Sequence, residues 1–327
     1  MKYFMTGATG FMGNRLARKL LERGNQVVAL VRDPEKAKGL VSSGVKVYRG
    51  DVTDKESMRR PMKGCDGVFH VAAWYKIGVR DKSPGRSINI DGTRNVLELM
   101  KELEIPKGVY TSSLAVNSDT KGDLKDESYR FTGKHLSEYD RTKAEAHHIA
   151  DRFIDEGLPL VILMPGLIYG PDGTSMSDES LRLYLQKKLP VIPRGSAYCW
   201  AHVDDVAEGH ILAMIKAKPG STYIIAGPPH DLVEAFSVAR DITGIRKPMV
   251  IPSWMLKATI PLSSLANWVA PLPEMYAPES LRVQAGVTYL GDNSKARKEL
   301  GYNPRPLEAG LRETLFHELE KIKNGNR

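Results

Sequence analysis

The stretch Thr6-Gly-Ala-Thr-Gly-Phe-Met-Gly13 follows a short apolar strand pattern and leads into the helical pattern Asn14-Arg-Leu-Ala-Arg-Lys-Leu-Leu21. A strand, a glycine turn and a helix in this order are typical of a place that holds a dinucleotide pyrophosphate. Gly7 permits the tight turn, Gly10 lets backbone N–H groups approach the phosphates, and Gly13 lets the helix pack closely on the strand. The helix N-terminus adds a partial positive charge. The opening of the chain therefore predicts dinucleotide binding.

Strand patterns alternate with helical patterns along the first half of the chain, which indicates right-handed βαβ units. We therefore expect an α/β fold, a Rossmann-type doubly wound parallel sheet over residues 1–170. Beyond Gly170 proline, glycine and serine become frequent, and residues 171–327 are expected to form a smaller C-terminal substrate-binding lobe, with 200–220 packing back on the first domain. The expected strands are 26–31, 45–49, 67–73, 106–113 and 160–164, with a short later strand at 223–226.

The composition is that of a globular protein large enough for two lobes, with 327 residues, 42% hydrophobic and 26% charged. The formal net charge is +8, but the basic residues are scattered, so nucleic-acid binding is not indicated. Cys65 and Cys199 form neither a disulfide framework nor a metal cluster, and they suit a reducing compartment. Because the first strand starts at once, no signal peptide is expected, and we predict a cytoplasmic protein.

The most apolar late stretch, 254–275, contains Lys257 and Pro261, and two further prolines near its end. These residues argue against an integral membrane helix. We expect packed helices of the second lobe here, and peripheral attachment to a membrane surface is the alternative.

The residues at the end of the second expected strand indicate whether the cofactor is NAD(H) or NADP(H). An NAD-type site has an acidic residue there for the ribose 2′-hydroxyl, but this chain has Val31 followed by Arg32. An arginine fork suits a 2′-phosphate, and Lys36 lies within a helical turn or two. We therefore expect NADP(H), with NAD(H) possible. The alternative is that Arg32 pairs with Asp33 or Glu35.

The third expected strand ends near Asp51 and Val52, which are placed to meet the adenine ring. A role of Asp51 as a helix N-cap is the plain alternative. Both roles are compatible.

Tyr139 and Lys143 are four residues apart, so on a helix their side chains share one face. A nearby ammonium stabilises a phenolate, which would bring the tyrosine pKa toward neutrality and allow proton exchange with a carbonyl or hydroxyl. Ser113 follows the fifth expected strand, and ligands bind at the carboxyl edge of such sheets. Its hydroxyl is thus expected to meet the substrate oxygen beside the tyrosine helix.

The chain resembles the extended short-chain dehydrogenase/reductase superfamily over nearly its whole length. The resemblance implies a catalytic set of Ser113, Tyr139 and Lys143, with Tyr139 as acid/base and Lys143 on the nicotinamide ribose; Asn89 would support the site. The motifs that carry it are 6–13, Gly50-Asp-Val52, His70-Val-Ala-Ala73, Asn89-Ile-Asp-Gly-Thr93, Thr111-Ser-Ser113, 139–143, Pro165-Gly-Leu-Ile-Tyr-Gly-Pro171, 202–207 and 300–304. The expected cofactor-binding residues are Gly7, Thr9, Gly10, Phe11, Met12, Gly13, Arg32, Lys36, Asp51, Val52, Ala72, Ala73, Tyr139, Lys143, Pro165, Gly166 and Ile168.

Two segments, 31–34 and 112–117, are similar to the dihydroflavonol-reductase branch, which reduces ketones or aldehydes with NADPH. Leu114 and Ala115 stand where nucleotide-sugar dehydratases carry an Asp-Glu pair, so elimination is disfavoured. The leading hypothesis is an NADP(H)-dependent oxidoreductase acting reversibly on a small carbonyl or alcohol substrate. The alternatives are a nucleotide-sugar epimerase with a transiently reduced cofactor, and a non-catalytic NADP(H)-sensing protein.

Substrate contacts are expected from both lobes. Trp74 and Tyr75 leave the fourth strand at its ligand edge, with loop packing as the alternative for both; the other candidates are Asn117, Tyr169, Arg194 and Tyr198. A homodimer through the Tyr139 helix is expected, and a monomer is possible.

The remaining titratable candidates are expected to be structural. His70 is expected to be packed, and His147 and His148 to be solvated. Asp204 and Asp205 precede a helix and suit a capping role, so no metal is expected.

Overall fold

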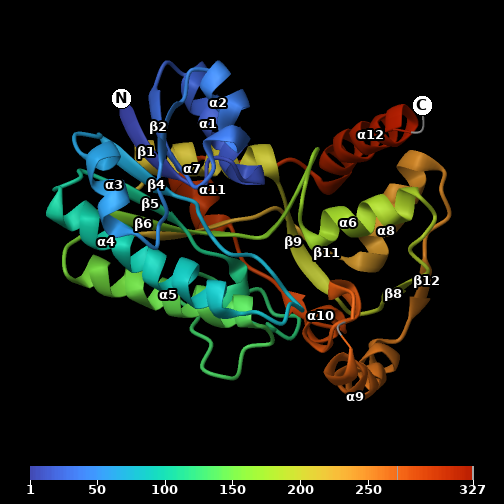
Figure 1. Ribbon diagram of the computed structural model, residues 1–327. Helices are drawn as coiled ribbons and strands as arrows, with labels where there is room; N and C mark the ends of the chain where they lie inside the picture. Colours follow the sequence, from blue (N-terminus) through green and yellow to red (C-terminus); the bar gives the residue numbers. More distant parts are fainter. Residues whose placement is uncertain (271, 326–327) are drawn as a thin grey trace.

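The computed structural model describes residues 1–270 and 272–325, and its centre is a seven-stranded, wholly parallel sheet (Figure 1). The strand order is β10-β6-β5-β4-β1-β2-β3. The expected Rossmann-type sheet is therefore confirmed. The strands are β1 (Lys2–Thr6), β2 (Gln26–Val31), β3 (Lys46–Arg49), β4 (Gly67–His70), β5 (Gly108–Thr111), β6 (Leu160–Pro165) and β10 (Thr222–Ile225).

Helices cover both faces of this sheet because its strands are apolar on both sides. In β1, Met5 points to one buried cluster and Phe4 to the other, as the two-residue period of a strand requires. The first face is covered by α1 (Phe11–Glu22) and α7 (Val203–Lys216), with the short helix α2 (Lys38–Ser42) beside α1. The second face is covered by α3 (Lys55–Met62), α4 (Gly92–Glu102) and α5 (Glu138–Asp155).

The rest of the chain forms a smaller body beside the carboxyl ends of the strands (Figure 1). Its sheet has the order β11-β9-β13, with β7 also paired to β9, and β12 pairs with β8. The strands are β7 (Leu167–Tyr169), β8 (Val191–Pro193), β9 (Ala197–His202), β11 (Pro229–Asp231), β12 (Met249–Ile251) and β13 (Thr288–Tyr289). Its helices are α6 (Met176–Leu185), α8 (Leu232–Thr243), α9 (Ser253–Val269), α10 (Pro278–Gln284) and α12 (Leu307–Gly325).

Three segments beyond residue 170 return to the first domain, the last of them α11 (Ser294–Leu300), which packs on α7 and β10. Helix α7 packs along α1, and β10 extends the main sheet through parallel pairing with β6. The short strand predicted at 223–226 therefore belongs to the main sheet. The side chains of Ile224 and Ile225 belong to different core clusters, and both are buried.

Helix α9 differs from the packed helix that the sequence predicts, since none of its residues is buried. Among the described residues, no helix combines the length and the apolar character needed to cross a bilayer.

Candidate active site

The glycine turn joins β1 to α1 in a geometry that side chains would obstruct. Gly7 has φ +75°, and a Cβ there would stand 2.6 Å from the backbone nitrogen of Ala72. A Cβ on Gly13 would overlap the carbonyl oxygen of Gly7. Gly10 is the N-cap residue of α1, and no side chain caps this helix. Its free N–H groups form the kind of cradle that fits a pyrophosphate.

The other expected cofactor residues lie along the same edge of the sheet. Arg32 follows β2 and is exposed, and within residues 1–270 and 272–325 its side chain makes no hydrogen bond or ion pair. Asp33 instead accepts the N–H of Glu35 at 3.1 Å, and Glu35 pairs with Lys38. The alternative that Arg32 binds Asp33 or Glu35 is therefore wrong, and its guanidinium is available to a ligand.

Asp51 lies at the end of β3 but does not cap the next helix. Its carboxylate accepts the backbone N–H and the hydroxyl of Thr53, both at 2.9 Å. Asp54 is the N-cap of α3, because it accepts the N–H groups of Glu56 and Ser57. Val52 is buried.

A buried hydrogen-bond chain fixes the backbone beside the glycine turn. His70 lies between the hydroxyls of Thr6, 2.8 Å from Nδ1, and Thr93, 3.0 Å from Nε2. Thr6 Oγ1 also accepts the N–H groups of Val71 and Ala72, each at 3.2 Å. Burial lowers the pKa of His70 to about 3. The histidine is therefore neutral and structural, as the sequence predicts.

Ser113, Tyr139 and Lys143 come together between β5 and α5. Ser113 follows β5, its hydroxyl oxygen accepts the N–H of Ala115 at 3.1 Å, and its side chain lines the same cavity as the Tyr139 phenol. Lys143 is buried, and its ammonium donates to the carbonyl oxygen of Thr111 at 2.7 Å and to the Tyr110 hydroxyl at 3.1 Å. The helical spacing read from the sequence thus places the two side chains at the end of β5.

The protonation of this set differs from the expectation. Burial raises the pKa of Tyr139 to about 12, against the opposing effect of the Ser113 hydrogen bond. Burial lowers the pKa of Lys143 to about 7. The ammonium is bonded to Thr111 and Tyr110 rather than to Tyr139, so the expected depression of the phenol pKa is absent.

The Lys143 shift predicts a pH dependence of stability. Its folded pKa is lowered from 10.5 to about 7, so between these values the unfolded chain binds more protons and stability rises with pH. The Lys143 contribution to the free energy of unfolding should grow by about 2 kcal/mol from pH 7 to 9. Urea denaturation at both pH values should show this gain in the native protein and in the exposed Lys36→Met control, but not in Lys143→Met. An equal gain in all three would contradict the shift.

Helix α5 is positioned by contacts that the sequence only partly indicates. Asn89 Oδ1 accepts the N–H of Trp74 at 2.7 Å, and its Nδ2 donates to the Thr142 hydroxyl at 3.0 Å. The Ser112 hydroxyl is bonded to His147 Nδ1 at 2.8 Å. His147 is buried and burial lowers its pKa to about 3. The prediction that His147 is solvated is therefore wrong, because this side of the helix faces the end of β5; His148 is exposed as predicted.

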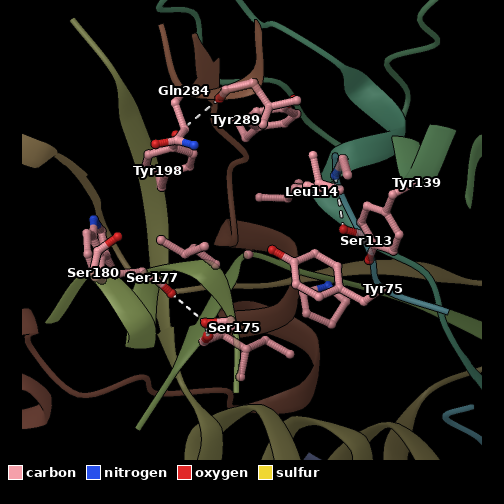
Figure 2. Close-up of a pocket in the computed structure, with 18 of the residues that line it drawn as sticks. Tyr75, Ser113, Leu114, Tyr139, Ser175, Ser177, Ser180, Tyr198, Gln284 and Tyr289 are labelled. Atoms are coloured by element: carbon pink, nitrogen blue, oxygen red, sulfur yellow. Dashed lines mark hydrogen bonds between the residues drawn. The ribbon is translucent and has the colours of Figure 1, made fainter. Parts of the chain in front are cut away.

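A cavity of about 360 Å³ opens between the two lobes at the Tyr139 hydroxyl (Figure 2). Aromatic and aliphatic side chains form most of its wall, including Leu167, Ile192 and Phe236. Among the described residues, the only lining side chains with a formal charge are Lys143 and Asp140. The predicted site residues that line it are Phe11, Met12, Ala73, Tyr75, Ser113, Tyr139, Lys143, Pro165, Gly166, Ile168 and Tyr198.

Four residues expected to touch substrate lie outside this wall. Trp74 packs its ring against the backbone at Gly85, and Asn117 is buried in the helical turn after Ser113. Tyr169 is buried against Trp200 and His202 in the second lobe. Arg194 is exposed in the turn between β8 and β9. The place of these residues in the sequence does not show whether their side chains point into the cavity.

The cavity wall contains polar residues that the sequence does not predict, namely Asp140, Gln284, Tyr289, Thr174, Ser175, Ser177 and Ser180. The Tyr289 hydroxyl donates to Asp140 Oδ2 at 3.0 Å, and its ring stacks on Tyr198 with centroids 6.0 Å apart. Burial raises the pKa of Asp140 to about 7. No spacing links residue 140 with residue 289. The pairing of β13 with β9 creates this group of side chains.

Asp204 and Asp205 have roles other than the expected cap. The N-cap of α7 is His202, whose Nδ1 accepts the N–H of Asp204 at 3.3 Å. The carboxylate of Asp205 instead forms an ion pair with the guanidinium of Arg305, with 2.9 Å between nitrogen and oxygen. His202, Asp204 and Glu313 are close enough to hold a cation, but Arg305 already donates to Glu313 at 2.7 Å and would repel one.

Known proteins share this fold and this site region. The family model for the "NAD dependent epimerase/dehydratase family" matches residues 3–226. A curated 4-hydroxy-2-methyl-3-oxo-4-farnesyl-3,4-dihydroquinoline-1-oxide ketoreductase from Stigmatella aurantiaca is 30% identical, over 93% of this chain and 92% of that protein. A putative dihydroflavonol 4-reductase from Synechocystis is 31% identical, over 96% and 93% respectively.

Among solved structures, UDP-glucose 4-epimerase from Thermotoga maritima has a TM-score of 0.78 at 22% identity, covering 98% of this chain and 100% of that one. At this identity the likeness concerns the fold. The family match, which spans the glycine turn and the Ser113, Tyr139 and Lys143 set, decides the assignment. The chain therefore belongs to the NAD-dependent epimerase/dehydratase family of extended short-chain dehydrogenases/reductases and is an enzyme of the NAD(P)-dependent oxidoreductase type.

Proposed function

We propose that this protein is an NADP(H)-dependent reductase of an uncharged, lipophilic ketone or aldehyde, and that it oxidises the corresponding alcohol in reverse. The observation that carries the proposal is the placement of Tyr139 and Ser113 at an apolar, aromatic cavity. Such a wall stabilises a lipophilic molecule through burial of its surface. The few polar groups would orient its carbonyl.

The proposed roles follow from the contacts. With a pKa near 12, the Tyr139 phenol is protonated at neutral pH and can donate its proton to a substrate oxygen. The Ser113 hydroxyl would donate a hydrogen bond to the same substrate oxygen. Lys143, held by Thr111 and Tyr110, would reach the nicotinamide ribose. The nicotinamide, when bound, supplies or accepts a hydride. Pro165, Gly166 and Ile168 would flank its ring, along with Phe11, Met12 and Ala73.

The charge of the cavity argues against the epimerase alternative. A nucleotide-sugar substrate carries a diphosphate, which protein sites usually meet with arginine, lysine or backbone donors. Within the described part of the chain, Lys143 is the only cation in the wall, and it lies at the nicotinamide end. A non-catalytic sensor is also disfavoured, because it would have no need of the assembled Ser113, Tyr139 and Lys143 set.

A spectrophotometric substrate screen tests the proposal. Purified protein is incubated with NADPH and a panel of lipophilic ketones, aldehydes and UDP-sugars. The proposed reductase consumes NADPH with the lipophilic carbonyls and leaves UDP-sugars unchanged. Interconversion of UDP-sugars without net change of absorbance would favour the epimerase, and NADPH binding without turnover would favour the sensor.

Arg32 should set the cofactor preference. We expect Arg32→Asp to lose affinity for NADPH by about tenfold or more, through loss of the guanidinium and repulsion of the 2′-phosphate, and to gain affinity for NADH. Isothermal titration with both cofactors measures the change. Arg49→Asp, which puts the same charge at the exposed end of β3, is the control and should retain more of the NADPH preference. Equal selectivity in Arg32→Asp and the native protein would rule out the assignment of Arg32.

A further inference from the structure

Helix α9 has its apolar face turned away from the protein. Large side chains recur along one side of the helix at the spacing of its turns, while Leu256, Ile260 and Ser263 on the other side are half-buried. A helix of a folded domain usually buries its apolar stripe, so this arrangement calls for a partner. The exposed fractions are Trp254 67%, Met255 43%, Leu262 69%, Leu265 63%, Trp268 80% and Val269 74%.

We propose that this face, defined by the residues just given and called the α9 face below, docks on the surface of an anionic lipid bilayer. Indole rings near both ends of the helix, Trp254 and Trp268, suit the boundary between headgroups and acyl chains. The helix has 17 residues, and the described helices include none able to cross a bilayer. It would therefore lie in the plane of the interface.

Charged side chains beside the α9 face favour anionic lipid. Helix α9 contains no acidic residue, and its one charged side chain, Lys257, is exposed. Arg80 lies next to the helix, because its guanidinium donates to the carbonyl oxygen of the half-buried Asn267 at 2.5 Å, and its side chain is otherwise exposed. The adjacent Asp81 is also exposed, and its carboxylate accepts the N–H and the hydroxyl of Ser83. The nearby Glu274 is paired with Lys76 at 3.7 Å. Each such cation adds to attraction toward a negative membrane surface.

A second copy of the chain would complement these positive charges less well than an anionic membrane. A two-fold dimer through the α9 face would use the same patch on both subunits. Lys257 and Arg80 of each copy would then lie on one shared interface without a described acidic partner on the helix. A membrane surface provides the opposite charge to both.

Helix α9 is connected with the cavity wall through α10. Helix α9 packs on α10, and α10 contributes Val283 and Gln284 to the cavity wall. Ile77 of the loop that carries Arg80 lines the same cavity. Figure 1 shows α9 at the bottom of the view, with α10 above it toward the centre of the molecule. Docking would thus bring the cavity to a source of lipophilic substrate; this consequence rests on the proposed function, whereas the docking does not.

Vesicle binding of the full-length protein tests the docking. The protein is sedimented with large vesicles of phosphatidylglycerol and phosphatidylcholine in equal parts, and with phosphatidylcholine alone. We expect binding to the anionic vesicles that weakens with salt. Leu262→Glu/Leu265→Glu should reduce the partition coefficient by at least about tenfold. The matched control Ile215→Glu/Phe316→Glu adds the same charge at exposed apolar positions of α7 and α12 and should bind like the native protein.

Tryptophan fluorescence provides a second readout if the double glutamate variant misfolds. Acyl-brominated lipid should quench native fluorescence, and Trp254→Phe/Trp268→Phe should remove that quenching, since the two remaining tryptophans lie away from the α9 face: Trp200 is buried and Trp74 is half-buried against Gly85. Absence of anionic-vesicle binding by the native protein, or equal binding by the α9 and control variants, would overturn the proposal. A native dimer that the α9 variant converts to monomer in light scattering, without vesicle binding, would assign the face to a second copy. Because these readouts need no turnover, they stay separate from failure of the reductase assay.

Discussion

Tyr139→Phe is expected to lower kcat for carbonyl reduction by about 10³-fold, because the substrate oxygen loses its proton donor. The ring stays in place, held by its edge contact with Tyr75 at a centroid distance of 4.8 Å. NADPH affinity should therefore change little. Stopped-flow NADPH oxidation gives kcat, and titration of NADPH gives the cofactor affinity.

Tyr75→Phe is the control for this variant. It also removes one phenolic hydroxyl from the cavity wall, but it leaves the Ser113 and Tyr139 pair intact. Its kcat should stay within a few fold of the native value. Near-native turnover by Tyr139→Phe, together with normal NADPH binding, would remove Tyr139 from the mechanism.

Gly13→Ala is expected to abolish tight cofactor binding. The added Cβ would overlap the Gly7 carbonyl oxygen and stand 2.8 Å from its carbon, and these are backbone atoms that cannot rotate away. The turn must open, so the N–H groups of α1 leave the positions that a pyrophosphate needs. NADPH affinity should fall by about 100-fold, with a lower melting temperature from the strained contact.

Gly39→Ala is the matched control. A Cβ at Gly39 would meet only the end of the Arg18 side chain, 3.9 Å away, and the residue lies in helix α2. Alanine favours helix over glycine, so stability should be equal or slightly higher, with unchanged NADPH affinity. Differential scanning fluorimetry with and without NADPH compares the two variants. Equal ligand-induced stabilisation in Gly13→Ala and Gly39→Ala would contradict the steric argument.

Features encoded by neighbours in the chain could be predicted. The turn at 6–13 and the Tyr139 and Lys143 pair are short motifs, in which local geometry alone fixes which groups meet. The alternation of strands and helices likewise predicts the sheet, although β10 was expected in the second lobe. Its place beside β6 depends on a pairing across some sixty residues, and no local pattern specifies that pairing.

Errors arose where burial depends on distant elements. His147 looks like a solvated helix residue, but the end of β5 covers it through Ser112. Tyr169 is expected to contact the substrate from the second lobe, but Trp200 and His202 of β9 pack against its ring and bury it. In each case the residues that bury the side chain are more than thirty positions away in the sequence, and no local pattern shows that they pack against it.

The sequence by itself predicted an α/β enzyme with a dinucleotide-binding glycine turn and a helix that presents Tyr139 and Lys143 on one face, because these features depend on contacts within one turn or one helix. Only the tertiary structure decided the rest. The pairing of β9 with β13 brought Tyr198 and Tyr289 to the cavity, and the packing of α9 on α10 turned its apolar face outward. Helical periodicity shows that a helix has an apolar side, whereas the packing of other elements decides which way that side faces.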